Sequence, residues 1–385
     1  MDDATIRDDP YLPERLRSAR RASGLTQEEV ADRLGIARTT VVALEKGQRA
    51  TRPDELVGLA RLYGRSVDEL LRDSPPVGDF VARFRTALSR APEPERVEGV
   101  VRDVEQLADD YRELEHITGR QVDGRSLQPY RVSELSPDAA GTDVANRERA
   151  RLQLGEAPLA QLRETLETAA GLRIFFPSMP ADVAGFFVFL DGLGGIVAIN
   201  SNHPWEKQRM SLSHEYFHFL TRPDRPELTV IRTGRVPKDE RSAEAFAREF
   251  LMPASGVRRL FTDRLRERPE GATAADVVDL ANFYGVAFDA MTLRLEGLRL
   301  IPPGTLDSLL HEGLRVREAK RLLGLPEHPP DERLVPSRYV DLAAEAYLNG
   351  LITEGRFARF LRADRVTARE VARHLESPVS RPNPS

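Results

Sequence analysis

The chain has 385 residues, which is more than one average domain needs and predicts two or three folded units. Its 41% hydrophobic and 6% aromatic residues are typical of a soluble, helix-rich protein, and its net charge of −5 argues against indiscriminate coating of nucleic acid while allowing one local basic surface. It contains no cysteine, which excludes disulfides, thiolate metal ligands and cysteine nucleophiles, so any metal must be held by His, Asp or Glu.

The first residues, MDDATIRDDPYLPERLRS, are acidic and polar, whereas a secretory signal needs a basic patch followed by an apolar run. No later stretch reaches membrane-spanning length without charges. We therefore expect a cytoplasmic protein with no membrane partner.

Residues 10–73 predict a compact all-helical domain of five short helices. Thr26 and Glu29 have the spacing of a capping box at the start of the second helix, and Gly35 ends that helix. Gly47 closes the third helix, and two further apolar stripes follow it. Such a unit can fold by itself.

The stretch GLTQEEVADRLGIARTTVVALEKGQR in this domain resembles the helix-turn-helix of the Xre/Cro family. The resemblance implies that the third helix, which opens with Arg38, Thr39 and Thr40, enters the major groove of a double-stranded DNA operator. It also implies that Gln27 and Lys46 lie near phosphates. The basic residues of the domain are roughly offset by its acids, so strong binding would need a homodimer or a protein partner. The alternative is a helical module that serves protein contact.

Residues 74–135 predict a helical connector, preceded by a hinge in DSPPVG. Pro92 and Pro94 divide the connector, and its second half carries a heptad-like stripe for less than three heptads. This pattern fits either a helix docked on its own protein or a connector that forms a dimer. Residues 119–142 are polar and rich in turns, which favours a domain boundary.

Residues 136–300 predict a mixed domain. Helices on either side of Pro158 lead to three runs typical of strands, LRIFF, AGFFVFL and GIVAIN, the last two joined by the hairpin signal DGLGG. A small sheet is therefore expected just before the stretch SLSHEYFHFL.

That stretch contains the pattern His-Glu-x-x-His. On a helix, His214 and His218 share one face and can offer two imidazole nitrogens to one metal ion, while Glu215 projects beside the ion. Glu215 is then in the position of a general base that deprotonates water at the metal. The alternative is a pair of hydrogen-bonded histidines at the edge of a helix.

A catalytic zinc site needs a third protein ligand. The following helix, KDERSAEAFAREFLMP, offers Glu240 and Glu244 on one face, and the spacing alone does not choose between them.

This region, from Glu148 to Gly297, resembles the ImmA/IrrE family of zinc metallopeptidases. The features that carry the resemblance are Asn200 after the last strand, Arg209 before the His-Glu-x-x-His helix, and the Leu-Met-Pro that ends at Pro253. The resemblance implies that Glu240, thirteen positions before that proline, is the third ligand. The chain departs from the family pattern at two positions, with Phe217 in place of a frequent Gly and Glu244 in place of a frequent Asn.

Residues 301–376 predict a helical C-terminal domain, in which a regulatory surface is an alternative to plain packing, and residues 377–385 predict a disordered tail. The predicted fold class is α+β and mostly helical: an all-helical helix-turn-helix domain, a minimal zincin-like domain with a three-stranded sheet, and a helical C-terminal section.

The resemblances imply a zinc-dependent endopeptidase fused to a DNA-binding module, which controls transcription by cleaving a repressor-like protein. Mn²⁺ is an alternative to Zn²⁺, since two His and a carboxylate suit both ions. The competing hypothesis is a transcriptional regulator, or an antitoxin-like binding protein, whose metal-site domain senses or holds a partner with little or no proteolysis. The sequence indicates no residue that would stabilise an oxyanion, and the roles of Asn200 and Arg209 stay open between structure and substrate contact.

Overall fold

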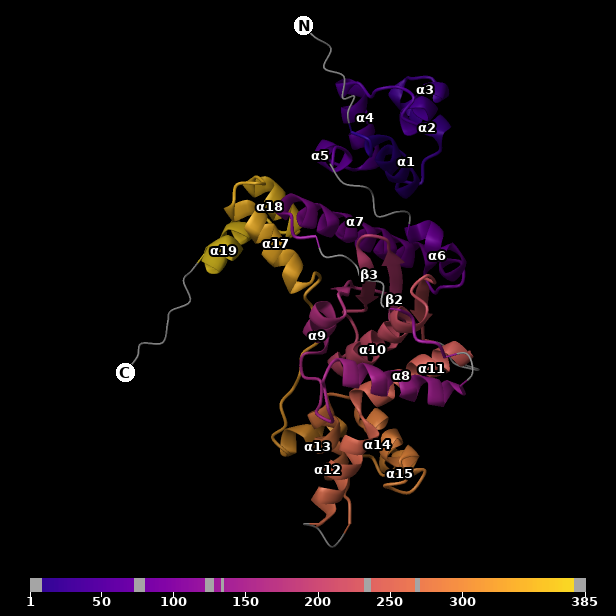
Figure 1. Cartoon of the computed structure of the whole chain (residues 1–385), viewed down its shortest axis with the longest axis vertical. Coiled ribbons are helices and arrows are strands. Elements are labelled where there is room, and N and C mark those ends of the chain that lie inside the picture. Colours follow the sequence, from indigo (N-terminus) through magenta and orange to yellow (C-terminus); the bar gives the residue numbers. More distant parts are fainter. Residues whose placement is uncertain are drawn as a thin grey trace, which may run out of the picture. The chain divides into compact units, whose positions relative to one another are not determined.

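The computed structural model describes residues 9–72, 80–121, 128–132, 135–231, 237–266 and 271–376. The chain divides into two compact units (Figure 1). One consists of Met1–Arg83, Val101–Val122 and Ser337–Ser385, and the other of Phe84–Val100 and Asp123–Pro336. The described residues are mostly helical with one small sheet, which confirms the predicted fold class. The predicted limits of the domains stay predictions, and the predicted hinge and tail lie outside the described residues.

Five helices open the first unit, as the sequence predicted. The Thr26 hydroxyl accepts the Glu29 backbone N–H at 3.2 Å, and the Glu29 carboxylate accepts the Thr26 N–H at 2.7 Å, so the capping box is present. Gly35 ends the second helix in the left-handed conformation, with φ 65°. The helices are α1 (Leu12–Ala22), α2 (Gln27–Leu34), α3 (Arg38–Glu45), α4 (Pro53–Tyr63) and α5 (Val67–Leu70).

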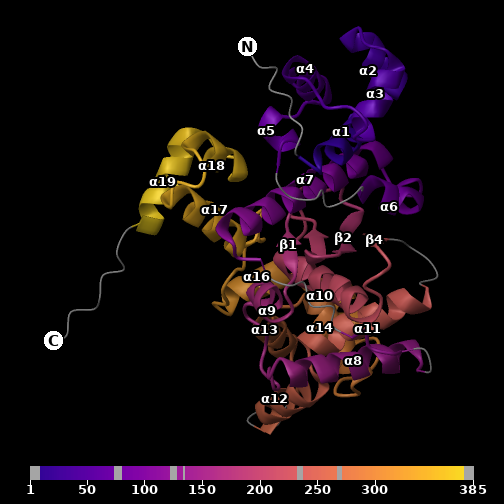
Figure 2. The same ribbon diagram turned by 45° about the horizontal axis from the view of Figure 1, so that its top comes forward.

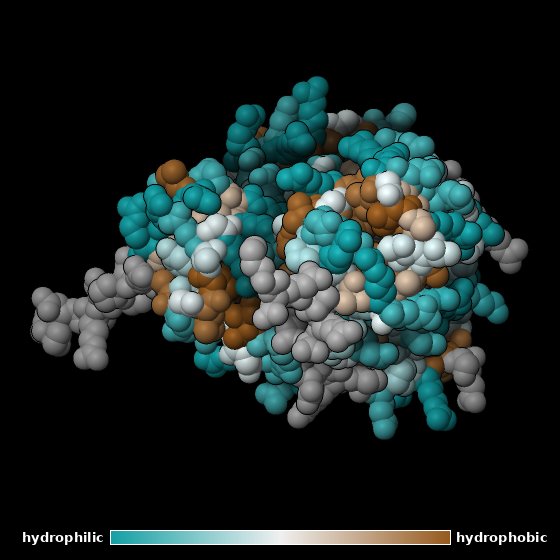
Figure 3. All heavy atoms as spheres, turned by 90° about the horizontal axis from the view of Figure 1, so that it is seen from above, coloured by the Kyte–Doolittle hydropathy of each residue, from teal (hydrophilic) through white to brown (hydrophobic). Residues whose placement is uncertain are grey.

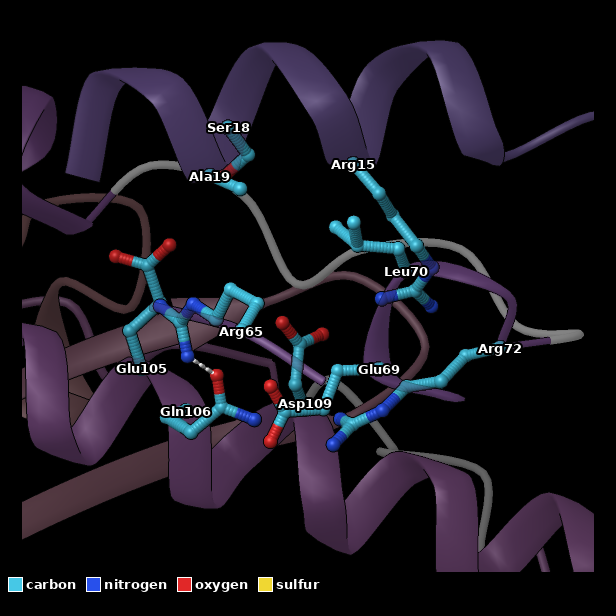
Figure 4. A pocket seen from close by; sticks show the side chains of 10 residues that line it. All are labelled: Arg15, Ser18, Ala19, Arg65, Glu69, Leu70, Arg72, Glu105, Gln106 and Asp109. Carbon is cyan, nitrogen blue, oxygen red and sulfur yellow. Dashed lines mark hydrogen bonds between the residues drawn. The ribbon is translucent and has the colours of Figure 1, made fainter. Parts of the chain in front are cut away.

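A long helix, α7 (Pro94–Thr118), contributes acids to the same unit. Arg15, Arg65 and Arg72 point from the helix-turn-helix domain toward the side chains of this helix (Figure 4). Arg72 is buried and pairs with Asp110 and, at 2.9 Å, with Glu113. The contact between the domain and α7 therefore includes buried ion pairs.

The heptad-like stripe of α7 is buried within the chain. Val97, Val104 and Tyr111, which define the stripe, are at most 3% exposed. This burial favours a helix docked on its own protein over a connector that forms a dimer.

Three C-terminal helices also belong to the first unit: α17 (Ser337–Leu348), α18 (Glu354–Phe360) and α19 (Arg365–Glu376). Tyr339 of α17 is fully buried, and its ring centroid lies 5.7 Å from that of Tyr111 on α7. Helix α17 of the C-terminal section thus packs against α7 through these two rings.

The second unit contains most of the remaining elements. Its first long helix begins at Pro137, where the Ser136 hydroxyl accepts the Ala139 N–H, so the polar boundary predicted over 119–142 extended too far. The polar composition of this stretch concealed the helix start. The helices are α6 (Phe80–Leu88), which begins in the first unit, α8 (Pro137–Arg151), α9 (Leu162–Ala169), α10 (Trp205–Thr221), α11 (Lys238–Leu251), α12 (Ala254–Arg266), α13 (Ala274–Tyr284), α14 (Phe288–Gly297), α15 (Thr305–His311) and α16 (Val316–Leu322).

The sheet has four strands in the order β1-β3-β2-β4, where three were predicted. The three predicted strands are β1 (Arg173–Phe175), β2 (Val183–Leu190) and β3 (Gly194–Ile199), and β2 and β3 form the predicted antiparallel hairpin. The additional strand, β4 (Glu227–Val230), pairs antiparallel with β2. With only four residues, it carries too short a pattern to be distinguished from a loop.

Helix α10 lies between the sheet on one side and α8 and α11 on the other (Figures 1 and 2). Gly141 lets α8 approach α11 closely, because a Cβ at this position would lie 2.3 Å from the carbonyl oxygen of Ser242 and 2.5 Å from the backbone nitrogen of Phe246. This close approach positions the first turns of α11 beside α10.

Hydrophilic side chains predominate on the face seen in Figure 3, and hydrophobic ones gather there in separate patches. Within the described part of the chain, no helix combines the length and apolar character needed to cross a bilayer.

Candidate metal centre

Helix α10 positions the His-Glu-x-x-His pattern inside the protein. Every residue from Ser211 to Thr221 is buried, because the helix is covered by the sheet and by α11. The side chains of His214 and His218 lie one turn apart on the same face, and their Nε2 atoms are 3.2 Å from each other.

Glu240, in the first turn of α11, completes the group. Its Oε2 lies 3.1 Å from Nε2 of His214, and its Oε1 lies 3.5 Å from Nε2 of His218. One ligand atom from each of the three residues lies within 4.8 Å of the others. Glu244 is exposed and does not belong to this group of described residues. The packing of α11 against α10 therefore brings Glu240, and not Glu244, to the two histidines, whereas the sequence spacing allowed either residue.

The electrostatics of the site differ between the two histidines: burial would lower the pKa of His214, but its hydrogen bond to Glu240 and the neighbouring carboxylates outweigh burial and raise it, whereas His218 is held neutral. Burial, together with the neighbouring His214, lowers the pKa of His218 to about 3, so this ring is uncharged at neutral pH and has a lone pair available for a cation. Burial acts against the charged form of Glu240 too, but the hydrogen bond and charge of His214 outweigh it and lower the pKa of this carboxyl. Two imidazoles and an ionised carboxylate are a donor set that fits Zn²⁺ or Mn²⁺.

Glu215 is fully buried next to the first histidine. Burial raises its pKa to about 8, although the charge of His214 and the hydroxyl of Thr229 on β4 act in the opposite direction. Among the described residues, neither carboxylate oxygen of Glu215 has a hydrogen-bond partner at normal distance. A buried polar group without a partner is unusual, and groups with a strongly perturbed pKa cluster at functional sites.

A buried network behind the site holds α10 to α8. The carboxylate of Glu148 is fully buried and accepts hydrogen bonds from the hydroxyls of Tyr130 at 2.6 Å and Tyr216 at 2.7 Å. The guanidinium of Arg151 donates to the same carboxylate at 2.8 Å and to the Tyr216 hydroxyl at 3.1 Å. Because Tyr216 lies between the two histidines in sequence, this network fixes the rotation of α10.

Two family models match the chain. A helix-turn-helix model matches residues 16–70, and a peptidase family model described as the IrrE N-terminal-like domain matches residues 167–296. The chain belongs to the helix-turn-helix family, and its residues 167–296 match the IrrE N-terminal-like domain. Both resemblances predicted from the sequence are confirmed.

Curated relatives match the helix-turn-helix part. An uncharacterized HTH-type transcriptional regulator, YobD of Bacillus subtilis (strain 168), is 43% identical over 58 residues, which is 15% of this chain and 52% of the relative. The cryptic phage CTXphi transcriptional repressor RstR of Vibrio cholerae is 37% identical over 60 residues, 16% of this chain and 54% of the relative. The chain thus spans about half the length of these two. An uncharacterized HTH-type transcriptional regulator of Methanothermobacter thermautotrophicus is 44% identical over 50 residues, 13% of this chain and 72% of the relative.

In the helix-turn-helix domain, the first turn of α3 faces water. Arg38 and Thr39 are exposed, as is Lys46 just after the helix, while Thr40 is half-buried. Gln27 is half-buried, and its amide donates to the carboxylate of Glu45 at 2.8 Å. The surface predicted to contact DNA is therefore accessible at α3, whereas Gln27 is held by its own domain.

Two residues that the resemblance singled out in the IrrE N-terminal-like domain have structural contacts. The buried amide of Asn200 donates to the carbonyl oxygens of Pro180 and Val183 and accepts the Met179 N–H, so it ties the loop before β2 to the end of β3. The buried guanidinium of Arg209 donates to the carbonyl oxygen of Gly285 at 2.9 Å. Sequence reasoning left both roles open.

Sequence reasoning missed the residues that support the site. The sequence analysis assigned no role to Glu148 beyond the start of the region that resembles the ImmA/IrrE family, and none to Tyr216. A tyrosine in the middle of a metal-binding pattern was the available signal, because a buried Tyr hydroxyl needs a hydrogen-bond partner. Its partner lies 68 residues away in sequence, and no spacing rule reaches that far.

Proposed function

We propose that this protein is a metal-dependent endopeptidase joined to a DNA-binding module, and that it controls transcription by cleaving a repressor-like partner protein. The observation that carries the proposal is the convergence of His214, His218 and Glu240 beside the buried carboxylate of Glu215. Four such groups, brought together from two helices, are more than a pair of hydrogen-bonded histidines requires.

His214, His218 and Glu240 would hold the cation, each through one atom. A divalent cation in this position supplies Lewis acidity, which lowers the pKa of water and polarises a peptide carbonyl. Two imidazoles and one carboxylate leave a coordination position open, as a hydrolytic site needs. Zn²⁺ and Mn²⁺ both suit the donor set, and the metal content of the purified protein identifies which of them is bound.

Glu215 would act as the general base. It follows His214 directly, so helix geometry places it about 100° around the axis of α10 from that histidine. A carboxyl group whose pKa burial has raised toward neutral accepts and returns a proton effectively near pH 7. The role of this residue is to move the proton from attacking water to the leaving amine.

The helix-turn-helix domain would bring the peptidase to its genomic target. Its α3 presents Arg38 and Thr39 to solvent, as insertion into a major groove requires. The relatives that match this domain are named transcriptional regulators, and one is named a repressor. A partner of the same fold class, bound at a neighbouring operator, would then lie within reach of the peptidase.

One observation favours the alternative function, a regulator that senses or holds a partner without cutting it. The Glu215 side chain has no exposed surface, and the His218 side chain is only 2% exposed. A peptide would reach these groups only after the surrounding elements move. A site that stays closed could bind metal and a partner without turnover.

The first step of the test is to purify the protein and measure how many metal ions it binds per chain. The wild type, Glu215→Gln and the control Glu244→Gln are then each co-expressed with candidate repressor-like proteins of the helix-turn-helix family. We expect one bound divalent cation in all three proteins, cleavage by the wild type and the control, and none by Glu215→Gln. Equal cleavage by Glu215→Gln, or protein that stays metal-free when Zn²⁺ and Mn²⁺ are added, would contradict the proposal.

A reporter gene under the operator separates the two functions. The peptidase proposal expects the transcriptional response to be lost in Glu215→Gln and weakened in Arg38→Ala. A response that survives Glu215→Gln but is lost in Arg38→Ala would support the regulator instead.

A further inference from the structure

Strand β4 borders the candidate metal centre. It follows α10 along the chain and is the last strand on one side of the sheet, next to β2 (Figure 2). The hydroxyl of Thr229 on this strand is close enough to Glu215 to act on the pKa of that carboxyl. All of these residues belong to the second unit. The strand therefore reaches the side of the centre on which the proposed general base lies.

A second acid of this strand, Glu227, is directed to the same side. Side chains alternate between the two faces of a strand, so Glu227 shares a face with Thr229, two residues later. In the register of the sheet, Glu227 lies opposite Phe187 of β2. The Phe187 ring faces α10, where its centroid lies 5.9 Å from that of Phe219. Because residues opposite each other on neighbouring strands share a face of the sheet, both relations place Glu227 on the face that α10 covers.

The charges around Glu227 are those of the metal centre. Burial raises the pKa of Glu227, the charge of Glu240 adds to this effect, and positive groups that include His214 act in the opposite direction. Glu227 in turn is among the groups that raise the pKa of Glu215. Its carboxylate is thus a neighbour of the centre, yet it is not one of the three residues whose ligand atoms lie within 4.8 Å of one another.

The carboxylate of Glu227 has no cationic partner. Among the described residues, its side chain forms neither an ion pair nor a hydrogen bond. Two arginines follow the end of α10, but Arg222 pairs with Asp239 at 2.7 Å, and Arg225 is exposed. Holding a half-buried carboxylate without a cation is costly, and a positive group brought by a ligand would offset that cost.

The exposure of Glu227 distinguishes it from the buried groups of the centre. Glu227 is half-buried, whereas Glu215 is fully buried. The three ligands account for the charge of a bound metal ion, and Glu215 accounts for proton transfer. Glu227 is left as a negative group beside the centre that a substrate can contact.

We propose that Glu227 determines specificity, because it receives a cationic group of the substrate next to the scissile bond. Either the side chain of an arginine or lysine, or a free N-terminus, supplies such a group. A guanidinium suits the carboxylate best, since it donates two parallel hydrogen bonds. This inference rests on the proposed peptidase function and adds to it the chemistry of the preferred substrate.

Small metal-binding probes test the inference without turnover. N-acetylarginine hydroxamate, norleucine hydroxamate and N-acetylnorleucine hydroxamate share one metal-binding group; the first carries a guanidinium, the second an ammonium, and the third neither. Their affinities for the full-length protein loaded with Zn²⁺ are measured by calorimetry. We expect a cationic probe to bind roughly tenfold more tightly than N-acetylnorleucine hydroxamate, because it gains a charge-assisted hydrogen bond. An advantage of the arginine probe identifies a side chain as the cation, and an advantage of the ammonium probe identifies the N-terminus.

Variants test whether Glu227 is the group that binds the cation. Glu227→Gln should lose the advantage of the cationic probe, while it keeps one metal ion per chain and binds N-acetylnorleucine hydroxamate like the wild type. Asp224→Asn is the matched control, because it removes a carboxylate from an exposed position between α10 and β4. This control should keep the advantage, and circular dichroism checks that both variants are folded.

The inference is overturned if neither cationic probe binds more tightly than the neutral one, if the advantage persists in Glu227→Gln, or if Asp224→Asn loses it as well. Loss of the metal ion in Glu227→Gln would make this residue a ligand and would overturn the inference too. Equal binding of all three probes leaves the proposed function intact. A protein that binds neither metal nor any probe contradicts the proposed function, and this inference with it.

Discussion

The close contact between α8 and α11 makes a quantitative prediction. In Gly141→Ala, the new Cβ would lie 2.3 Å from the Ser242 carbonyl oxygen, 2.5 Å from the Phe246 nitrogen and 2.7 Å from the Ala245 Cβ. Two of these three atoms belong to the backbone of α11 and cannot rotate away. To restore ordinary contact at 3.4 Å, α11 would have to move back by about 1 Å.

The expected loss follows from two opposing terms. Replacing a helical glycine by alanine stabilises a protein by about 0.5–1 kcal/mol. Overpacking a close contact costs about 1–3 kcal/mol, and the upper part of this range applies because the contacted atoms are backbone. We therefore expect Gly141→Ala to lower the free energy of unfolding by about 1–2 kcal/mol. Glu240 lies two residues before Ser242, so the same movement should weaken metal binding roughly tenfold.

The assay is urea unfolding followed by the fluorescence of Trp205, which belongs to the same unit as Gly141. Gly297→Ala is the matched control, because Gly297 is also a helical residue of this unit and a Cβ there meets nothing within 4 Å. The control should be neutral or more stable by up to about 1 kcal/mol. If Gly141→Ala is as stable as the control and binds metal like the wild type, the close packing of α8 on α11 does not position the site.

Four further predictions follow from single residues. In competition with a chromogenic chelator, Glu240→Gln should bind the metal at least roughly tenfold more weakly than the wild type, and the metal affinity of Glu244→Gln should stay within about a factor of two of the wild type. The reverse result would show that the exposed Glu244 is the ligand. Tyr216→Phe removes a hydroxyl that donates to a fully buried carboxylate, so it should lower the free energy of unfolding by about 1.5–3 kcal/mol in urea, and an unchanged midpoint would refute the network. Burial alone would raise the pKa of Asp331, but hydrogen bonds from arginines lower it to about 2, below the ordinary 3.8. The ionised Asp331 therefore stabilises the protein fully above about pH 4, and this stabilisation is lost as the pH falls to about 2. Asp331→Asn should destabilise the protein at pH 7 and change its stability little at pH 2, as measured by thermal unfolding at both pH values. Arg38→Ala should weaken operator binding by about 1–3 kcal/mol and relax sequence preference in fluorescence anisotropy with operator and unrelated duplexes, and equal binding to both by the wild type would argue for protein contact instead.

Short-range patterns allowed much of the fold to be predicted. The capping box at Thr26, the stop at Gly35 and the β2–β3 hairpin each depend on residues that are close in sequence. Strand β4 was not predicted, because its four residues become a strand only by pairing with β2. Its identity is thus a property of the sheet and not of its own composition.

The candidate site likewise combines features that the local sequence determines with features that only tertiary packing determines. The one-turn spacing of His214 and His218 follows from helix geometry, and the sequence alone was enough to predict that the two rings meet. The spacing of residues in the sequence did not determine that Glu240 rather than Glu244 joins the two histidines, or that the Tyr216 hydroxyl donates a hydrogen bond to Glu148. Each depends on which faces of different helices meet, and the packing of side chains distant in sequence decides that. Local order is encoded within a few residues, whereas the third ligand and the buried network around Glu148 exist only because α8, α10 and α11 are folded together.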